Sequence, residues 1–140
     1  MKTILIIEAN VFILENLTEY FELEHYIILA SNNGKNGIEQ AREFIPDLII
    51  SNILMTGNNG FEVLNSIMNT FITSKIPLIF STTMAEKVDK AKAMDCGADD
   101  YIVKPYELEV LVKMAKDCIK SGCRKDRQTI LHNNNKSLQG

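Results

Sequence analysis

Residues 46–64 read PDLIISNILMTGNNGFEVL and contain, in order, the patterns of a strand, a loop and a helix. The run 47–52 is mostly apolar and ends in the polar residue Asn52, which is typical of a buried strand. Residues 57–60 favour a turn, and a helical spacing of apolar residues begins at Phe61. In open parallel α/β sheets, functional side chains lie at the carboxyl ends of the strands. Asn52 therefore occupies a position where a functional side chain is expected, and it carries an amide instead of an acid.

The same alternation of strand and helix patterns runs through the chain on both sides of this stretch. Short apolar runs predict strands, and apolar residues spaced three and four apart predict helices. The predicted strands cover 3–7, 26–30, 47–52, 78–83 and 100–104. The predicted inward faces of the intervening helices are Val11, Leu14, Leu17 and Phe21; Ile38, Ala41 and Ile45; Phe61, Leu64, Ile67, Met68 and Phe71; Ala85, Val88, Ala91 and Met94; and Leu108, Leu111, Val112, Ala115 and Ile119. This order predicts an α/β fold with a parallel sheet and helices on both faces, because each parallel connection must cross over.

Length and composition are those of one globular domain. The 140 residues suit a single core, and contents of 46% hydrophobic and 24% charged residues are ordinary. The net charge of -3 gives no overall field that would attract nucleic acid. Cys96, Cys118 and Cys123 lack the spacing of a zinc site or a disulfide framework. No signal peptide or membrane span is indicated, so a cytoplasmic location is expected.

The segment 121–140 loses helical periodicity and is rich in Asn, Ser, Lys and Gly. This composition predicts a flexible tail or linker that follows a domain over 1–120. A small basic cluster of Arg124, Lys125 and Arg127 leaves open the alternative of a docking segment. The cluster is too short to indicate nucleic-acid binding by itself.

Motifs at the predicted strand ends resemble those of the receiver domains of two-component response regulators. In that family the matching positions hold an acidic pair, the phosphoacceptor aspartate, a hydroxyl residue and a lysine-proline pair. The residues that stand there are Glu8-Ala9-Asn10 after the first strand, Asn52 after the third, Thr82-Thr83 after the fourth and Lys104-Pro105 after the fifth. The resemblance covers residues 1–120. It implies a doubly wound, flavodoxin-like sheet of five parallel strands in the order 2-1-3-4-5, with helices on both faces.

Two residues depart from the family pattern where its chemistry takes place. Receiver domains phosphorylate themselves on the aspartate, with a divalent cation held by that aspartate and the acidic pair. Here Asn52 replaces the nucleophile, and an amide is a poor nucleophile that does not give the ordinary acyl phosphate. Ala9 replaces one member of the acidic pair, which leaves Glu8. We therefore expect weak or absent Mg²⁺ binding and no other cofactor.

Lys104 has one obvious anionic partner once these acidic groups are lost. We expect an ion pair between Glu8 and Lys104, with Asn52 as a candidate hydrogen-bonded bridge, that permanently occupies the pocket. Lys104 followed by Pro105 also resembles the family's lysine on a cis peptide bond, and cis bonds are essentially confined to proline.

The resemblance also implies a switch and a partner surface. Thr82 matches the family's switch hydroxyl, and Tyr101 matches the aromatic residue whose inward or outward rotamer reports the state. The plain alternatives are a strand-end hydroxyl and a half-buried ring. In the family, partners bind the fourth helix, the fifth strand and the last helix, here around Lys87, Lys90, Tyr101 and Lys104. The expected partner is a protein such as a sensor kinase or an output protein. Homodimerisation stays open, and neither nucleic acid nor a membrane is expected.

Three functions are weighed. The favoured one is a non-enzymatic, degenerate receiver that acts by phosphorylation-independent protein binding. The second is a phosphoaccepting regulator that uses a neighbouring residue such as Thr56, Ser51 or Glu8, or a receiver module cut from a larger hybrid kinase or output protein. The third is a flavodoxin-like cofactor binder. The loop 8–11 disfavours it, because this loop lacks the Gly or Ser/Thr residues of a phosphate cradle.

Overall fold

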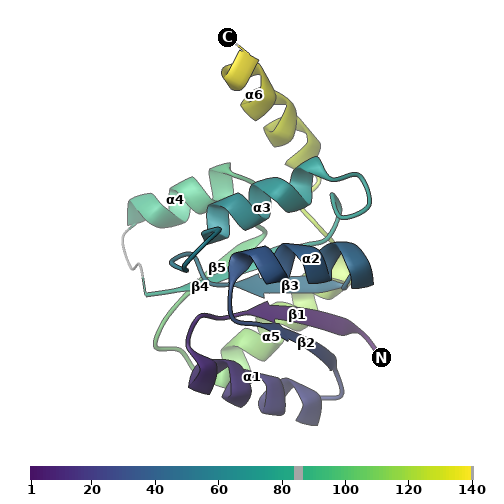
Figure 1. Cartoon of the computed structure of the whole chain (residues 1–140), viewed down its shortest axis with the longest axis vertical. Coiled ribbons are helices and arrows are strands. Elements are labelled where there is room, and N and C mark those ends of the chain that lie inside the picture. The colour runs from purple at the N-terminus through teal and green to yellow at the C-terminus, as the bar shows by residue number, and fades with distance from the viewer. Residues whose placement is uncertain (84–86, 140) are drawn as a thin grey trace.

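The computed structural model describes the backbone of residues 1–83 and 87–139, and the side chains of these residues other than 87–89 and 134–139. Strands and helices alternate along the chain as far as the fifth helix, as the sequence predicts, and a sixth helix follows it (Figure 1). The ends of the strands differ from the predicted ends by no more than one residue. The strands are β1 (Thr3–Ile7), β2 (Ile27–Ser31), β3 (Leu48–Ser51), β4 (Leu78–Thr82) and β5 (Asp100–Val103). The helices are α1 (Val11–Leu23), α2 (Gly34–Phe44), α3 (Gly60–Asn69), α4 (Lys87–Asp95), α5 (Leu108–Ser121) and α6 (Arg127–Gln139).

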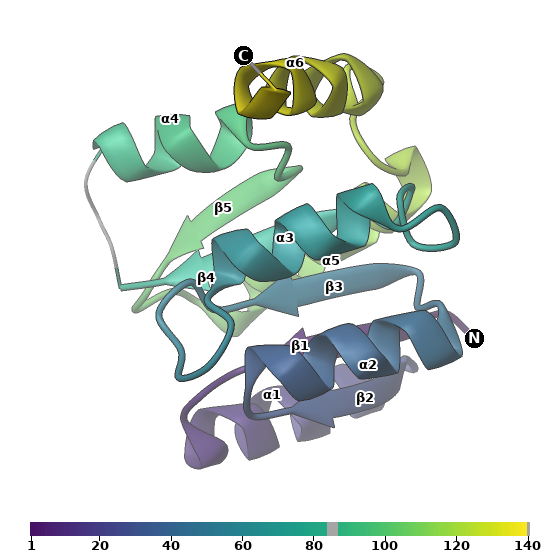
Figure 2. The ribbon, with the colours of Figure 1, turned by 45° about the horizontal axis from the view of Figure 1, so that its top comes forward.

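The strands form one parallel sheet in the order β2-β1-β3-β4-β5, which confirms the predicted doubly wound topology. Helices α1 and α5 cover one face, and α2, α3 and α4 cover the other (Figure 2). Side chains of β1 alternate between the two faces, with Leu5 and Ile7 in one apolar cluster and Ile4 and Ile6 in the other. A central strand that is covered on both faces must be apolar throughout, which explains its unbroken run of Ile and Leu.

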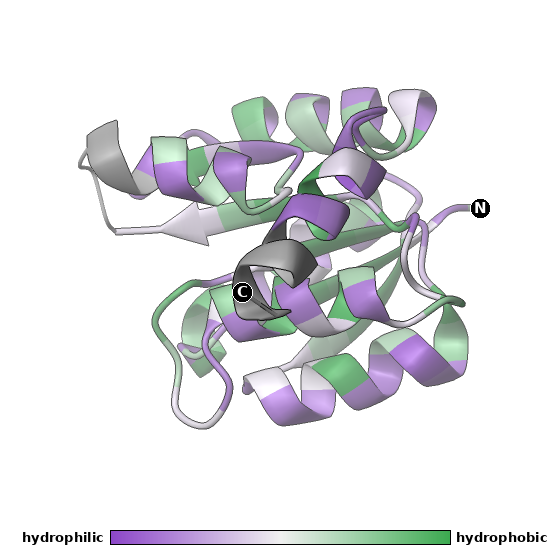
Figure 3. Ribbon diagram, turned by 90° about the horizontal axis from the view of Figure 1, so that it is seen from above, coloured by the Kyte–Doolittle hydropathy of each residue, from purple (hydrophilic) through white to green (hydrophobic). Residues whose placement is uncertain are grey.

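The helices pack on the sheet through apolar faces, and polar residues cover their outer sides (Figure 3). The predicted faces were wrong at some helix ends. Val11 and Ile45 are 47% and 43% exposed because they lie at the first turn of α1 and just beyond α2. Phe71 is 93% exposed because α3 ends at Asn69, before the expected face reaches it. None of the helices in the described part of the chain is long and apolar enough to cross a membrane.

Helix α4 turns a different face to the sheet from the one that its sequence predicts. Ala91 is exposed, whereas Ala93 is completely buried. The predicted inward residues Ala85 and Val88 lie outside the described side chains. The amphipathic pattern of α4 is weak, so spacing alone did not locate its buried face.

Asparagine side chains begin the helices that follow β1, β2 and β3. Asn10 accepts hydrogen bonds from the first turn of α1, and Asn33 does the same for α2. Asn59 and Glu62 form a capping box at the start of α3, with two reciprocal bonds of 3.0 Å. These caps fix where each loop ends, and thereby hold the loops at the carboxyl edge of the sheet.

The segment 121–140, which the sequence predicts to be a flexible tail or linker, contains a helix. Helix α5 ends at Ser121, a short connection follows, and α6 extends from there to Gln139. α6 extends beyond the body of the sheet and leads to the C-terminus (Figure 1). Arg127, which resembled a surface charge in the sequence, is only 1% exposed. Arg127 therefore holds the start of this segment against the domain, and the flexible tail or linker stays a prediction.

Candidate functional site

The sheet register brings the predicted site residues to one edge. The backbone N–H of Asn52 donates to the carbonyl of Ile7, with a distance of 2.9 Å, so the ends of β1 and β3 lie level. The backbone N–H of Lys104 donates to the carbonyl of Thr82, with a distance of 2.7 Å, and this aligns β4 with β5. The residues gathered at this edge are Glu8, Asn52, Thr82 and Lys104.

Glu8 and Lys104 form an ion pair at the centre of this edge, which confirms the pair expected from the sequence. The ammonium group of Lys104 donates to Oε1 of Glu8. The second carboxylate oxygen, Oε2, accepts the backbone N–H of Asn10 at 3.0 Å. The side chains of Glu8 and Lys104 are 2% and 14% exposed. The charges of a pair with so little access to water are weakly screened by salt, and removing either partner would strongly destabilise the fold.

Asn52 lies beside this pair and is half-buried. Its backbone carbonyl accepts a hydrogen bond from the hydroxyl of Ser51 at 2.9 Å, and its backbone N–H donates to the carbonyl of Ile7 in β1. Among the described residues, no hydrogen bond joins its side-chain amide to Glu8 or Lys104. The expected bridge through Asn52 is therefore not observed, because the two charged groups meet directly.

The residues at this edge do not fit the magnesium site that the resemblance implies. Mg²⁺ prefers a near-octahedral set of hard oxygen ligands, several of them anionic. Glu8 supplies a carboxylate here, but both of its oxygens are engaged by protein donors. Ala9 is exposed and offers only a methyl group. No group of three or more His, Cys, Asp or Glu side chains in the described residues is arranged to hold a metal ion.

The residues that match the family's switch lie inside the fold. Thr82 and Tyr101 are 2% and 6% exposed. The Tyr101 ring belongs to the apolar cluster between the sheet and helices α2, α3 and α4. The peptide bond between Lys104 and Pro105 is cis, as the sequence motif predicts.

Tyr106 is a residue of this region that the sequence reasoning missed. Its hydroxyl accepts the hydroxyl of Ser81 at 3.3 Å. Burial raises the pKa of Tyr106, the hydrogen bond from Ser81 lowers it, and the charge of Glu8 raises it further. The position directly after the Lys104-Pro105 motif was the signal that could have indicated it. A cavity of about 470 Å³ opens here and is lined by Ile13, Asn16, Leu17, Thr83, Lys104, Pro105, Tyr106 and Leu108.

Comparison with known proteins identifies the family. The family model of the response regulator receiver domain matches residues 4–116. The chain belongs to this family. Protein PilH of Pseudomonas aeruginosa is 34% identical over 113 residues, which cover 81% of this chain and 93% of PilH. Response regulator ArlR of Staphylococcus epidermidis is 34% identical over 130 residues, which cover 90% of this chain and 56% of ArlR. This chain therefore spans about half the length of ArlR.

A solved receiver domain has the same fold. The signal receiver domain of a signal transduction histidine kinase from Syntrophus aciditrophicus superposes with a TM-score of 0.79 and 29% sequence identity. The superposition covers 86% of this chain and 92% of that structure. Receiver domains thus occur among these relatives both in response regulators and in a kinase.

The predicted partner surface of this receiver domain is only partly available on its exterior. Lys90 is exposed on α4, but Tyr101 is buried and Lys104 is engaged with Glu8. The side chain of Lys87 lies outside the described residues. Tyr101 is hidden because successive residues of β5 face opposite sides of the sheet and it faces the layer of α3 and α4. Exposed side chains of the α4 and α5 surface include Lys90, Lys92, Val110, Lys113 and Lys116.

The three alternative phosphoacceptors differ in access. Ser51 is completely buried, and its hydroxyl donates to the carbonyl of Asn52. Glu8 is buried and paired with Lys104. Thr56 is exposed in the loop between β3 and α3. Of these three residues, only Thr56 is open to a phosphodonor from solution.

Proposed function

We propose that this receiver domain acts in two-component signalling as a protein-binding module that does not accept a phosphoryl group. The observation that carries the proposal is the buried Glu8–Lys104 ion pair beside Asn52, which stands at the phosphoacceptor position of the family. An amide there provides no anionic nucleophile. The pair also engages the two charged groups that phosphoryl transfer in this pocket would need.

The ion pair opposes phosphorylation independently of Asn52. A phosphoryl group in this pocket would need a cation, and Lys104 would have to leave Glu8 to provide one. Glu8 would then keep its charge in a buried position without its partner, a change that typically costs about 3–5 kcal/mol. The amide of Asn52 and the Glu8–Lys104 ion pair therefore each disfavour phosphorylation, the first because it is a poor nucleophile and the second because of the cost of separating its charges.

The partner surface in this proposal is the face formed by α4, β5 and α5. Thr82 and Tyr101 are both buried, and the proposal assigns this face a conformation that does not depend on phosphate. A partner that binds this conformation more tightly than an alternative conformation would shift the population of molecules toward this conformation. The partner that fits the family is a cytoplasmic sensor kinase or output protein, and a second copy of the chain is the alternative.

Phosphodonor labelling tests the proposal. The purified protein is incubated with Mg²⁺ and a small-molecule phosphodonor such as acetyl phosphate, and its intact mass is measured. We expect no phosphoryl adduct on the natural chain. The variant that combines Asn52→Asp with Ala9→Asp restores the missing carboxylates and should be labelled in a way that EDTA abolishes.

Two further variants make this experiment specific. Asn52→Asp alone should be labelled weakly, because Ala9 still leaves the metal site one carboxylate short. Full labelling of this single variant would contradict the role given to Ala9. A stoichiometric adduct on the natural chain would overturn the proposal, and its loss in Thr56→Ala would identify the exposed loop hydroxyl as the acceptor.

A further inference from the structure

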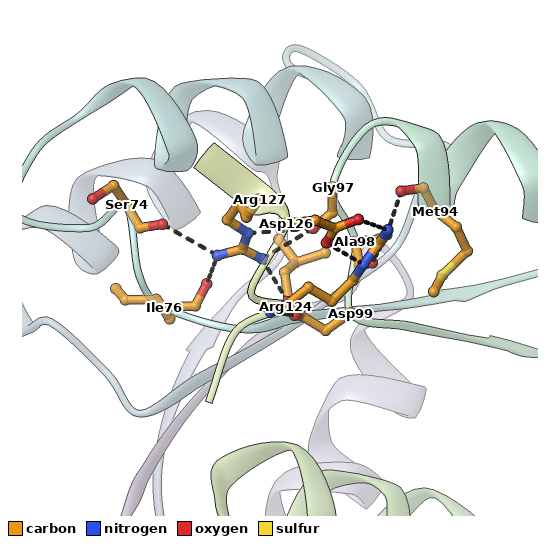
Figure 4. Close-up of polar contacts among 10 residues, drawn as sticks. Ser74, Ile76, Met94, Gly97, Ala98, Asp99, Arg124, Asp126 and Arg127 are labelled. Carbon is orange, nitrogen blue, oxygen red and sulfur yellow. Dashed lines mark hydrogen bonds and ion pairs between the residues drawn. The ribbon is translucent and has the colours of Figure 1, made fainter. Parts of the chain in front are cut away.

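Arg127 at the start of α6 is a buried charged side chain outside the candidate site, and its guanidinium group is bonded to several protein partners. Its guanidinium group donates to the carbonyls of Ser74 (3.3 Å) and Ile76 (2.5 Å), before β4, and to that of Gly97 (3.2 and 3.3 Å) after α4. It also forms an ion pair with Asp99 (Figure 4). One side chain therefore ties the C-terminal segment to two connections that are distant in the sequence.

Asp99 is the anionic centre of this cluster, and its side chain is 4% exposed. It accepts the backbone N–H groups of Leu78 (2.8 Å) and Arg124 (2.6 Å) in addition to Arg127. Burial raises the pKa of the Asp99 carboxyl, and the charge of Arg127 and these N–H donors oppose the shift. The carboxylate is thus held in a buried position by donors, two of which come from the C-terminal segment.

Arg124 connects the same segment to the end of α4. Its guanidinium group donates to the carbonyls of Met94, in the last turn of α4, and Ala98, at 3.1 Å for the latter (Figure 4). Asp126 holds this guanidinium from the other side, with distances of 3.1 and 2.9 Å. The carbonyl of Met94 also accepts the backbone N–H of Gly97 at 3.1 Å, and a cation that hydrogen-bonds a carbonyl of the last turn stabilises that end of a helix.

Apolar contacts complete the docking of α6. Ile130 and Leu131 are partly buried and pack against the cluster that contains Ala93 of α4 and Met68 of α3. Among the side chains of α4 that are described, only Ala93 is buried. Within residues 90–95, α4 therefore buries little apolar area on the sheet, and the contacts from the C-terminal segment add to what holds this part of the helix.

We propose that residues 124–131, here called the strap, fix the position of α4 against β5, so that the strap rather than the Asn52 pocket controls the α4–β5–α5 face. Segments with few buried apolar contacts open locally most readily, and residues 90–95 of α4 would form such a segment without the strap. The relevance of this control to signalling rests on the proposed function. The mechanical coupling of the strap to α4 does not depend on the proposed function.

Hydrogen exchange of backbone amides measures this coupling without any partner. In the Arg127→Met variant, amides of residues 90–98 should exchange roughly tenfold faster or more, since α4 loses its anchor while the rest of the sheet keeps its core. Amides of α1, on the opposite face of the sheet, and of β1, which β3 and β4 separate from β5, should change much less. The matched control is Lys125→Met, which removes an exposed positive charge from the same strap and should leave exchange in α4 as it is.

A second variant keeps the test decisive if Arg127→Met does not fold. Ile130→Ala combined with Leu131→Ala removes only partly buried side chains, and it should also accelerate exchange in α4. Unchanged exchange in α4 in this variant would overturn the proposal, as would an equal acceleration in α1, β1 and α4. Because no phosphodonor or partner is present, this outcome is separate from the labelling experiment on the proposed function.

Discussion

Glu8 and Lys104 show what single residues reveal before a structure is known. Their pairing was predictable, because the loss of acidic groups at Asn52 and Ala9 left one anion and one cation at neighbouring strand ends. The hydrogen-bonded bridge expected through Asn52 is not observed, and whether such a bridge forms depends on side-chain distances that the register alone does not determine. Tyr106 was missed because a tyrosine next to a motif looks like any surface residue until its burial is known.

Lys104→Met should destabilise the domain although it removes a charge that is close to the surface. Glu8 would be left buried without its cation, so the free energy of unfolding should fall by about 3 kcal/mol in urea denaturation. Glu8→Gln added to this variant should recover part of the loss, because it removes the unpaired charge.

The matched control for this variant is Lys113→Met. Lys113 pairs with Asp117 at 3.9 Å, but both side chains are more than 60% exposed at 78% and 67%. An exposed pair of this kind contributes little to stability. A loss of stability in Lys104→Met that is no larger than in Lys113→Met would contradict the view that the Glu8 pair is energetically important.

At the scale of elements, local sequence signals account for the helix ends that are formed by capping residues close by in the sequence. The asparagines before α1, α2 and α3 explain those helix starts, and Gly97, just past α4, adopts a positive φ of 111°, which suits a glycine after a helix end. Helix α6 gave no such signal. Its anchor, Arg127, bonds to carbonyls from two other connections, and a sequence pattern cannot display partners that only the tertiary fold assembles.

Asn59→Ala should test the capping box at the start of α3, the helix that follows the loop after Asn52. The variant loses the bond to the backbone N–H of Glu62, so the free energy of unfolding should fall by about 1 kcal/mol. Glu62→Ala should cost less by itself, and the effects should not add, because each bond supports the other. Equal and additive losses in a double-mutant cycle would indicate that the two caps act independently.

At the scale of the whole molecule, the sheet was predictable in full and the partner surface was not. Apolar runs that alternate with helical patterns predict a parallel sheet, because each helix can serve as the crossover between two parallel strands, and the family resemblance implies the strand order that the structure has. Which side chains of the α4–β5–α5 face reach the exterior depends on packing. The structure buries Tyr101, pairs Lys104, and docks the strap at the end of α4. The surface offered to a partner therefore differs from the one that the motifs alone suggest.

The most direct test of the central claim is an NMR titration of the whole ¹⁵N-labelled domain with acetyl phosphate in the presence of Mg²⁺. The variant with Asn52→Asp and Ala9→Asp serves as the responsive reference. For the natural chain we predict that the amide signals of Glu8, Asn52, Thr82 and Lys104 stay in place, while those of the reference variant move. Shifts of these signals in the natural chain, extending into α4, would contradict the claim that this pocket, with its ion pair, does not accept a phosphoryl group.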